Sequence, residues 1–239
     1  MPAISIVMPT YNRGKDFLPE AVKSVLAQSF TDFELIVVDD ASTDNTAQVI
    51  TAFDDPRIVY LQSDHNHGEY WATNFGVNRA QGKYLTWVHS DDLLPPDSLE
   101  RRFASLEGLP DLDFVHGDID RIDETGTLTE RLDSVTWDKY KIVQQYLMKP
   151  EERERKYIIH HTTVLMKWKF FYQAGPFDCS LPYAGDIDWL IRAVIRGRFQ
   201  YIPATLYRYR THSGTRRATD PQHGVDKQAV RDMITRRYL

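Results

Sequence analysis

The chain has 239 residues but a single cysteine, Cys179, so no disulfide can form within it. Sparse cysteine is typical of proteins from reducing compartments, and we expect a cytoplasmic location. The sequence also lacks any apolar run near the ~20 residues that a membrane-spanning helix needs, and no basic-then-apolar signal region begins it. These absences predict a soluble protein, with a peripheral contact on the inner face of the cell membrane left open.

A surplus of positive charge is lacking as well. The 29 Lys and Arg residues stand against 34 Asp and Glu residues, a formal net charge of −5, whereas nucleic-acid-binding domains are usually basic. The sequence contains neither a GxGxxG dinucleotide cradle nor a GxxxxGK[ST] phosphate loop. We therefore expect no nucleic-acid partner and no P-loop phosphoryl transfer.

Strand-like and helix-like patterns alternate through the first hundred residues. Four short β-branched runs are predicted to form strands: 4–9, 33–40, 57–61 and 84–88. Helices are predicted over 17–30, over 70–81, and from the capping residues 42–46 to about Phe53. Such alternation with short connections predicts an α/β fold, in which helices cover both faces of a mostly parallel sheet.

The pattern after Pro110 is less regular. A strand, a turn at Gly126 and a second strand are predicted within 113–130. Further predictions are an exposed connection over 149–156, a strand over 157–166, an amphipathic helix over 186–197, and two short strands over 199–203 and 205–210. Because no linker or repeat separates the parts, we expect one domain over 1–239.

Polar residues gather at the ends of the predicted strands. In chain order they are Pro9, Thr10 and Tyr11, then Asp39 and Asp40, then 64–68 with Gly68, then 89–92 with Asp91 and Asp92. Open α/β sheets bind ligands beyond the carboxyl ends of their strands, so this edge is the expected site.

The adjacent carboxylates Asp91 and Asp92 repel each other and are costly to bury without a partner. Mg²⁺ and Mn²⁺ favour carboxylate oxygens together with substrate phosphates, so a metal–diphosphate complex would suit the pair. A simple turn before the helix that starts near Asp97 is the alternative. Asp39 and Asp40 form a second pair, which either caps the next helix or binds a ligand.

Three segments carry a family resemblance: SIVMPTYNR (5–13), SVLAQSFTDFELIVVDDASTDNT (24–46) and AQGKYLTWVHSDDLLPPDSLE (80–100). Together they resemble the nucleotide-binding half of inverting family 2 glycosyltransferases, which have the GT-A fold. A further match covers GDIDWLIRAVIRGRFQYIPATLYRYRTHSGT (185–215). The resemblance implies that 1–110 bind a nucleotide sugar and that the remainder, 111–239, forms the acceptor and catalytic half.

Members of this family transfer a sugar from a nucleoside diphosphate, most often UDP, to a hydroxyl acceptor. The resemblance therefore implies a nucleotide-sugar donor, a glycan or glycolipid acceptor, and Mn²⁺ or Mg²⁺ as cofactor. It suggests a role in polysaccharide biosynthesis for the cell envelope, and it is compatible with a homo-oligomer.

The resemblance also implies roles for the strand-end residues. Thr10 and Tyr11 line the base pocket beside Pro9, with Tyr11 stacked on the base, while Asp40 contacts the base and Asp39 lies close by. Nucleotide-binding residues are further expected at Gly68, Asn74, Asp91 and Asp92, and metal ligands at Asp91 and His212.

The motif AGDIDW falls where the family keeps its catalytic base, which implies Asp186, with Asp188 as the alternative within the motif. Inverting transfer needs one carboxylate that takes the proton of the acceptor hydroxyl. Asp186 could instead be only the N-cap of the helix over 186–197.

Two departures from the family stand out. His89 replaces a frequent aspartate, and it could ligate the metal, bond the ribose or fill space. A common arginine is missing near Asn74, so phosphate recognition falls to another group; Arg210, Arg216 and Arg217 are the candidates.

Other histidines invite a metal interpretation that we do not favour. His160 and His161 lie on a predicted strand, where neighbours face opposite sides, so we expect neither to bind metal. His65 and His67 have suitable spacing, but a turn explains them as well. The competing functions are a degenerate nucleotide-sugar-binding module and, less favoured, a sugar nucleotidyltransferase.

Overall fold

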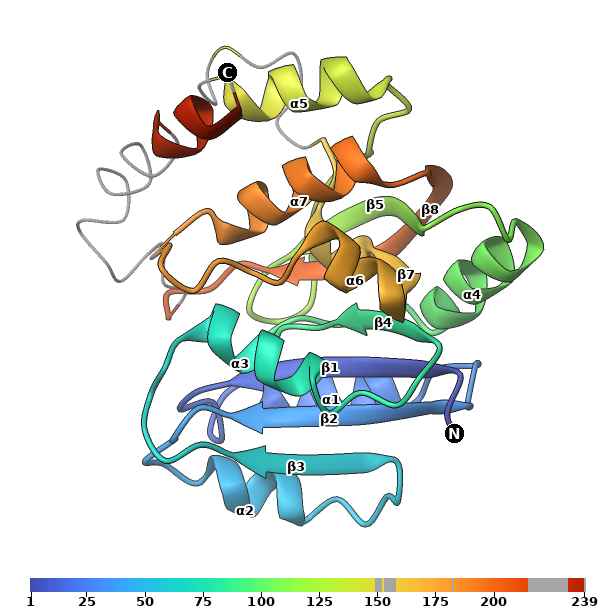
Figure 1. Cartoon of the computed structure of the whole chain (residues 1–239). Helices are drawn as coiled ribbons and strands as arrows, with labels where there is room; N and C mark the ends of the chain where they lie inside the picture. Colours follow the sequence, from blue (N-terminus) through green and yellow to red (C-terminus); the bar gives the residue numbers. More distant parts are fainter. Residues whose placement is uncertain (149–151, 153–157, 182, 215–231, 239) are drawn as a thin grey trace.

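An eight-stranded sheet forms the centre of the computed structural model, which describes residues 1–148, 152, 158–181, 183–214 and 232–238 (Figure 1). The strands are β1 (Ile4–Thr10), β2 (Phe33–Asp39), β3 (Ile58–Gln62), β4 (Tyr84–Trp87), β5 (Phe114–Ile122), β6 (Leu128–Leu132), β7 (Leu165–Lys167) and β8 (Phe199–Arg210). The helices are α1 (Leu18–Leu26), α2 (Thr46–Thr51), α3 (Glu69–Val77), α4 (Ser98–Gly108), α5 (Lys139–Leu147), the 3-10 helix η2 (His161–Thr163), α6 (Trp168–Ala174) and α7 (Gly185–Arg196).

The first four strands confirm the predicted parallel arrangement. They lie in the order β3-β2-β1-β4, and every neighbouring pair among them is parallel. All seven residues of β1 are buried, because helices cover both of its faces. One core joins its even-numbered residues to α1, α2 and α4, and the other joins its odd-numbered face to α3, α6 and α7 (Figure 1).

The second half continues the same sheet with mixed strand directions. The short strand β7 lies antiparallel between β4 and β5, and β5 and β6 form the predicted hairpin with Gly126 in its turn. β8 runs parallel to β5. The sheet is therefore mostly parallel, with helices on both faces, as predicted.

β8 is one long strand where two short ones were predicted. Its pairing with β5 shifts register on both sides of Asp118, and Pro203 lies in the skipped stretch of β8. Proline has no N–H to give to the ladder, so the strand bulges there and then resumes. The prediction of two strands mistook this bulge for an end.

The predicted strand over 157–166 is wrong. Residues 161–163 form the η2 turn instead, and only Leu165 and Met166 of that range belong to β7. The backbone N–H and the hydroxyl of Thr163 both donate to the carbonyl of His160, which favours a turn over an extended chain. His160 and His161 therefore do not alternate across a sheet.

Helices α1 and α3 are shorter than predicted. α1 ends at Leu26, and the amide of Gln28 then binds the carbonyl of Pro95 and the N–H of Leu99. α3 ends at Val77 in a tighter turn. The helix over 185–196 ends before Gly197, as predicted.

The predicted connection 149–156 lies outside the described residues except for residue 152. Near the C-terminus, residues 232–238 are helical, and Ile234 is buried in the core that contains α7. Within the part of the chain that the structure describes, no helix combines the length and apolar character that crossing a membrane would require.

Candidate active site

The turn after β4 is fastened to β8 at the carboxyl edge of the sheet. The backbones of Leu93 and Arg208 exchange two hydrogen bonds, of 3.0 and 2.9 Å. The N–H of His89 donates to the hydroxyl of Tyr207 at 3.0 Å. The acidic turn 89–92 is therefore held rigidly beside the ends of the parallel strands.

Asp91 and His212, far apart in the sequence, meet at this edge. The Nε2 of His212 lies 3.0 Å from Oδ2 of Asp91, and the ring packs on Phe17 with 4.7 Å between centroids. Nδ1 of His212 accepts the N–H of Gly214 at 3.2 Å, so its proton lies on Nε2. A carboxylate and an imidazole suit Mn²⁺, provided that this proton moves when Nε2 binds the metal.

The surroundings of Asp91 favour its charged form. Burial raises its pKa, but the hydrogen bond from His212 and the charges of His89 and Arg13 outweigh this and lower the pKa below its usual range. Among the described residues, His89, Asp91 and Asp92 form a group whose potential ligand atoms lie within 4.8 Å of one another. The site therefore concentrates negative charge where a cation is expected.

Asp92 is anchored inside the protein. Its Oδ2 accepts the hydroxyl of Tyr207 at 2.8 Å, and its Oδ1 accepts the N–H of Arg210 at 2.7 Å. Burial and the neighbouring charge of Asp91 raise its pKa. Its carboxylate ties the β4 turn to β8. Because both oxygens already accept hydrogen bonds within the protein, the geometry does not favour a direct contact with the nucleotide.

Arg210 does not fit the predicted phosphate-binding role. Its guanidinium is buried and lies over the ring of Phe17 at 4.4 Å. It donates to the carbonyls of Asp91 and Glu124 at 2.9 and 2.8 Å and to a carboxylate oxygen of Glu20 at 2.7 Å. These donors already have partners within the protein, so Arg210 supports the backbone around the site and does not offer its guanidinium to a phosphate.

The other predicted phosphate-binding arginines, Arg216 and Arg217, lie outside the described residues. Arg13 also lies beside the acidic turn, with its NH2 3.9 Å from Oδ2 of Asp91 and 3.2 Å from the carbonyl of Gly214. Arg13 ends the segment 5–13 that carries the resemblance, but the sequence analysis assigned it no role.

The end of β1 offers groups suited to a base. Thr10 is buried, and its hydroxyl has no hydrogen-bond partner among the described residues. Tyr11 follows with 46% of its surface exposed. Pro9 is paired with Val38 inside the sheet, so it can affect the base pocket only through the path of the backbone.

Asp39 and Asp40 are both buried and bonded within the protein. Asp39 accepts the hydroxyl of Tyr60 at 2.7 Å. Asp40 accepts the N–H groups of His67 and Gly68 at 3.0 and 2.7 Å. They hold the loops that surround the predicted base pocket, and Asp40 keeps the segment before α3 in place.

Gly68 and Asn74 support α3 in different ways. Gly68 has φ of +95°, which other residues rarely adopt. The amide of Asn74 donates to the carbonyl of Phe177 at 2.9 Å and accepts its N–H at 3.0 Å. Asn74 therefore clamps α3 to the segment before α7, and the predicted nucleotide contact of its amide is not supported.

Asp186 stands in the first turn of α7, with 33% of its side chain exposed. The hydroxyl of Tyr70 accepts the N–H of Gly185 at 3.0 Å and so fixes the start of the helix. Oδ2 of Asp186 lies 3.6 Å from Nδ1 of the buried His161. Asp186 is thus held in place yet reachable.

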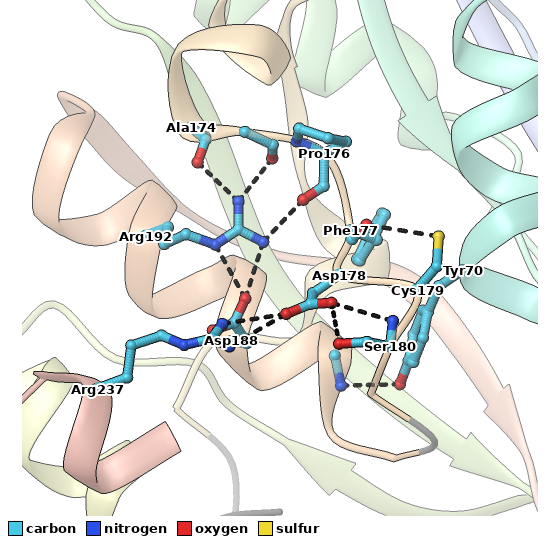
Figure 2. A network of polar contacts seen from close by, with 12 residues as sticks. Tyr70, Ala174, Pro176, Phe177, Asp178, Cys179, Ser180, Asp188, Arg192 and Arg237 are labelled. Carbon is cyan, nitrogen blue, oxygen red and sulfur yellow. Dashed lines mark hydrogen bonds and ion pairs between the residues drawn. The ribbon is translucent and has the colours of Figure 1, made fainter. Parts of the chain in front are cut away.

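The surroundings of Asp188 argue against it as the alternative base. Its side chain is 0% exposed and accepts two 2.9 Å bonds from Arg192 and a 3.0 Å bond from Arg237 (Figure 2). It also accepts a 3.2 Å bond from the hydroxyl of Tyr238. A buried carboxylate with this many partners cannot receive a proton from a substrate. It joins α7 to the helical residues 232–238 instead.

Two imidazoles, His89 and His161, lie between Asp92 of the acidic turn and Asp186. Nδ1 of His89 lies 3.5 Å from Oδ2 of Asp92, and Nε2 of His89 lies 3.1 Å from Oε1 of Glu69 and 3.4 Å from Nε2 of His161. His161 in turn faces Asp186. The acidic turn and Asp186 therefore belong to one polar cluster.

These two imidazoles differ in charge preference. Burial lowers the pKa of His89, but Glu69 and Asp92 outweigh it and raise the pKa well above its usual value. Burial and the charges of His160 and His89 lower the pKa of His161. Sequence reasoning missed Glu69, which lies outside the segments that carry the resemblance, and it expected no metal at His161 because it placed that residue on a strand.

A family model described as Glycosyl transferase family 2 matches residues 5–177. The chain belongs to glycosyl transferase family 2. The relative named putative colanic acid biosynthesis glycosyl transferase WcaA, from Escherichia coli K12, is 31% identical over 196 residues, 81% of this chain and 67% of that protein. An uncharacterized glycosyltransferase of Rickettsia conorii is 32% identical over 88% of this chain, which spans 34% of that longer protein.

Solved structures agree with the fold. S. aureus TarS in complex with UDP-GlcNAc has a TM-score of 0.71 at 19% identity, over 98% of this chain and 71% of that one. The mannosyltransferase PcManGT of Pyrobaculum calidifontis, in complex with GDP-Man and Mn²⁺, has a TM-score of 0.64 at 20% identity, over 97% of this chain and 65% of that one. These likenesses confirm the predicted GT-A fold.

Proposed function

We propose that this family 2 glycosyltransferase is an inverting enzyme that moves a sugar from a nucleoside diphosphate, in the first place UDP, to a hydroxyl acceptor. The observation that carries the proposal is the shared edge of the sheet, where Asp91 with His212 and the reachable carboxylate of Asp186 belong to one polar cluster. One group can then stabilise charge on the donor's diphosphate while the other removes the proton of the acceptor hydroxyl.

In this proposal Asp186 is the general base. It takes the proton of the acceptor hydroxyl as that oxygen attacks the anomeric carbon, while the bond to the diphosphate breaks on the opposite side. Its position at the first turn of α7 is held by the Tyr70–Gly185 bond, so the carboxylate is oriented before the acceptor arrives. Asp188 has no part in the reaction.

Asp91 and His212 would hold the divalent ion, Mn²⁺ or Mg²⁺, which neutralises charge on the leaving diphosphate when bound. Arg13 lies next to Asp91 and is the described cation that we assign to phosphate oxygens. The PcManGT structure is a complex with Mn²⁺, which supports this ion as the first to test.

The nucleotide base is assigned to the end of β1. Tyr11 is exposed enough to stack on a base, and the buried hydroxyl of Thr10 can bond its edge. Asp39 and Asp40 hold the loops around the base in place through their hydrogen bonds. Gly68 and Pro9 set the path of the backbone beside it. The TarS structure is a complex with UDP-GlcNAc, which supports a UDP-linked donor.

The acceptor is assigned to glycans or glycolipids. The name of the E. coli relative includes colanic acid biosynthesis, which supports a polysaccharide product and a place in assembly of the cell envelope. A cytoplasmic enzyme that works at the inner face of the membrane would meet such acceptors, and an oligomer is compatible with this arrangement.

Calorimetric titration of UDP, GDP, TDP and CDP, each with and without Mn²⁺, tests the donor site. We expect Mn²⁺-dependent binding of one nucleotide, at least about 10-fold weaker in Asp91→Asn, which corresponds to about 1.4 kcal/mol. The matched control is Asp111→Asn, whose carboxylate is 90% exposed and far from this turn in sequence. Failure of a folded wild-type protein to bind any of the four nucleotides would overturn the proposal.

A further inference from the structure

Three side chains meet beside the acidic turn without belonging to the Asp91–His212 pair. Oε1 of Glu69, at the start of α3, lies 3.1 Å from Nε2 of His89, which in turn lies 3.4 Å from Nε2 of His161 in η2. All three potential ligand atoms lie within 4.8 Å of one another. They come from three separate elements and converge on one point.

The spacing of these atoms is that of metal ligands. Zn–N bonds are about 2.0–2.1 Å, so two ligand atoms of a tetrahedral ion stand about 3.3 Å apart. The two Nε2 atoms and the carboxylate oxygen are separated by 3.4 and 3.1 Å. An ion in the middle would use both imidazole lone pairs, whereas a direct contact can use only one of them.

The outer nitrogens of both imidazoles face carboxylates. Nδ1 of His161 is 3.6 Å from Oδ2 of Asp186, and Nδ1 of His89 is 3.5 Å from Oδ2 of Asp92. A histidine that binds metal through one nitrogen commonly donates its other N–H to a carboxylate, which fixes the ring and its tautomer. Here both outer nitrogens face a carboxylate at ion-pair distance, and each contact would have to shorten to about 3 Å to become such a hydrogen bond. Asp92 is itself held by Tyr207.

The cluster is closed on one side and open on the other. His161 is buried against the ring of Trp87, whereas the side chain of Glu69 is 44% exposed. Three protein ligands with one open side leave a coordination position for water or a substrate oxygen. A purely structural ion would be enclosed by four protein ligands.

We propose that Glu69, His89 and His161 form a second metal site, which takes a divalent ion of borderline softness, Zn²⁺ in preference to Mg²⁺. Two imidazoles and one carboxylate favour Zn²⁺ and its neighbours in the transition series, because Mg²⁺ prefers oxygen ligands and an octahedral shell. The site differs from the donor site in its ligands, and it goes beyond the proposed function without depending on it.

Titration with Co²⁺, whose visible absorption reports its coordination, and competition with Zn²⁺ test this site in the full chain. The measurement uses a His65→Ala/His67→Ala/Asp91→Asn background, because Asp64, His65 and His67 form another described group with metal-like spacing and Asp91 belongs to the proposed donor-site metal pair. We expect one Co²⁺ per chain, displaced by Zn²⁺ and not by a roughly 100-fold excess of Mg²⁺, because Mg²⁺ prefers oxygen ligands to imidazoles.

Four variants separate the ligands from their surroundings. His89→Ala and His161→Ala should abolish the Co²⁺ spectrum, and Asp186→Asn should weaken Zn²⁺ about 10–100-fold, as loss of a partner behind a metal ligand usually does. His160→Ala is the control, since His160 belongs to none of the described ligand groups. A spectrum that survives in both His89→Ala and His161→Ala would overturn the proposal, as would its absence from the background protein.

Zinc X-ray absorption of the background protein guards against variants that fail to fold. Two imidazole ligands on the ion support the site, and none or one would contradict it. The outcome is independent of the donor site, because the nucleotide titration reports on Asp91 and can fail while Zn²⁺ still binds, or succeed while it does not.

Discussion

The hydroxyl of Tyr70 in α3 accepts the N–H of Gly185 at the start of α7, at 3.0 Å. Gly185 is required there, since a Cβ would stand 2.6 Å from the ring of Tyr70. This contact joins the donor half of the sheet to the helix that carries Asp186, and it sets where the proposed base stands.

Replacing Gly185 should therefore disturb stability and turnover together. Gly185→Ala forces the ring of Tyr70 aside, and we expect a loss of about 1–3 kcal/mol in the free energy of unfolding. Chemical denaturation measures it, and the double variant with Tyr70→Ala should recover part of the loss because the clash is gone. A Gly185→Ala protein as stable as wild type would contradict the close approach.

Asp186 and Asp188 should separate cleanly by substitution. We expect Asp186→Asn to lower the rate of nucleoside diphosphate release from the donor about 10²–10⁴-fold while nucleotide affinity and melting temperature stay near wild type. Steady-state turnover and calorimetry on the same preparation provide both numbers. Full turnover in Asp186→Asn would remove it as the base.

Asp188→Asn should act on stability instead. The loss of the charge leaves Arg192 without its anion, whereas Arg237 keeps its ion pair with Asp178 (Figure 2), and we expect a destabilisation of about 2–3 kcal/mol. The effect is smaller than for a wholly buried pair, since the side chain of Arg237 is 42% exposed. Thermal and chemical unfolding measure it, and an unchanged unfolding curve would argue against the clamp.

The parallel half of the fold was predictable because buried parallel strands read as continuous β-branched runs, as β1 does. The stretch over 157–166 read the same way, yet it forms η2 and part of a three-residue strand. Local composition could not distinguish the two cases. The hydroxyl of Thr163 bonds the backbone of its own stretch, and only tertiary pairing decides which residues are extended.

The site was predictable in part. The meeting of Asp91 and His212 followed from the resemblance, and so did the position of Asp186 at the edge of the sheet. Two residues along a helix are turned by about 200°, so only one of Asp186 and Asp188 could face that edge, and sequence alone did not say which. Arg192 lies one helical turn from Asp188, but its other partners, Arg237 and Tyr238, come from residues 232–238, which no local pattern connects to it.

Acid should destabilise the protein through His116. Burial lowers its pKa to about 3, and its Nδ1 donates to Ser134, whose hydroxyl donates to the carbonyl of Ile158. Since the unfolded chain binds this proton near the ordinary pKa of about 6.5, stability should fall between about pH 6.5 and 3 by up to about 1.4 kcal/mol per pH unit. Above this window the residue makes no pH-dependent contribution.

His116→Gln should flatten that pH dependence, because the amide cannot titrate. Denaturant unfolding at a series of pH values measures the slope, and His65→Gln is the matched control, since the side chain of His65 is 65% exposed. Equal slopes for wild type and His116→Gln would show that other groups control acid unfolding.

Thr10 offers the sharpest test of the base pocket, because its hydroxyl is buried without a partner among the described residues. Thr10→Val keeps the shape and removes the unpaired group, so we expect the free protein to gain about 1 kcal/mol of stability. Nucleotide affinity should fall about 10-fold if the hydroxyl bonds the base. The control Thr86→Val removes a hydroxyl that donates to Val164 at 2.7 Å and accepts from the buried Arg102 at 2.9 Å, so it should lose about 2–3 kcal/mol of stability and leave nucleotide binding unchanged. Opposite signs for stability and affinity at Thr10 would identify a group reserved for a ligand, whereas an unchanged affinity would move the base elsewhere.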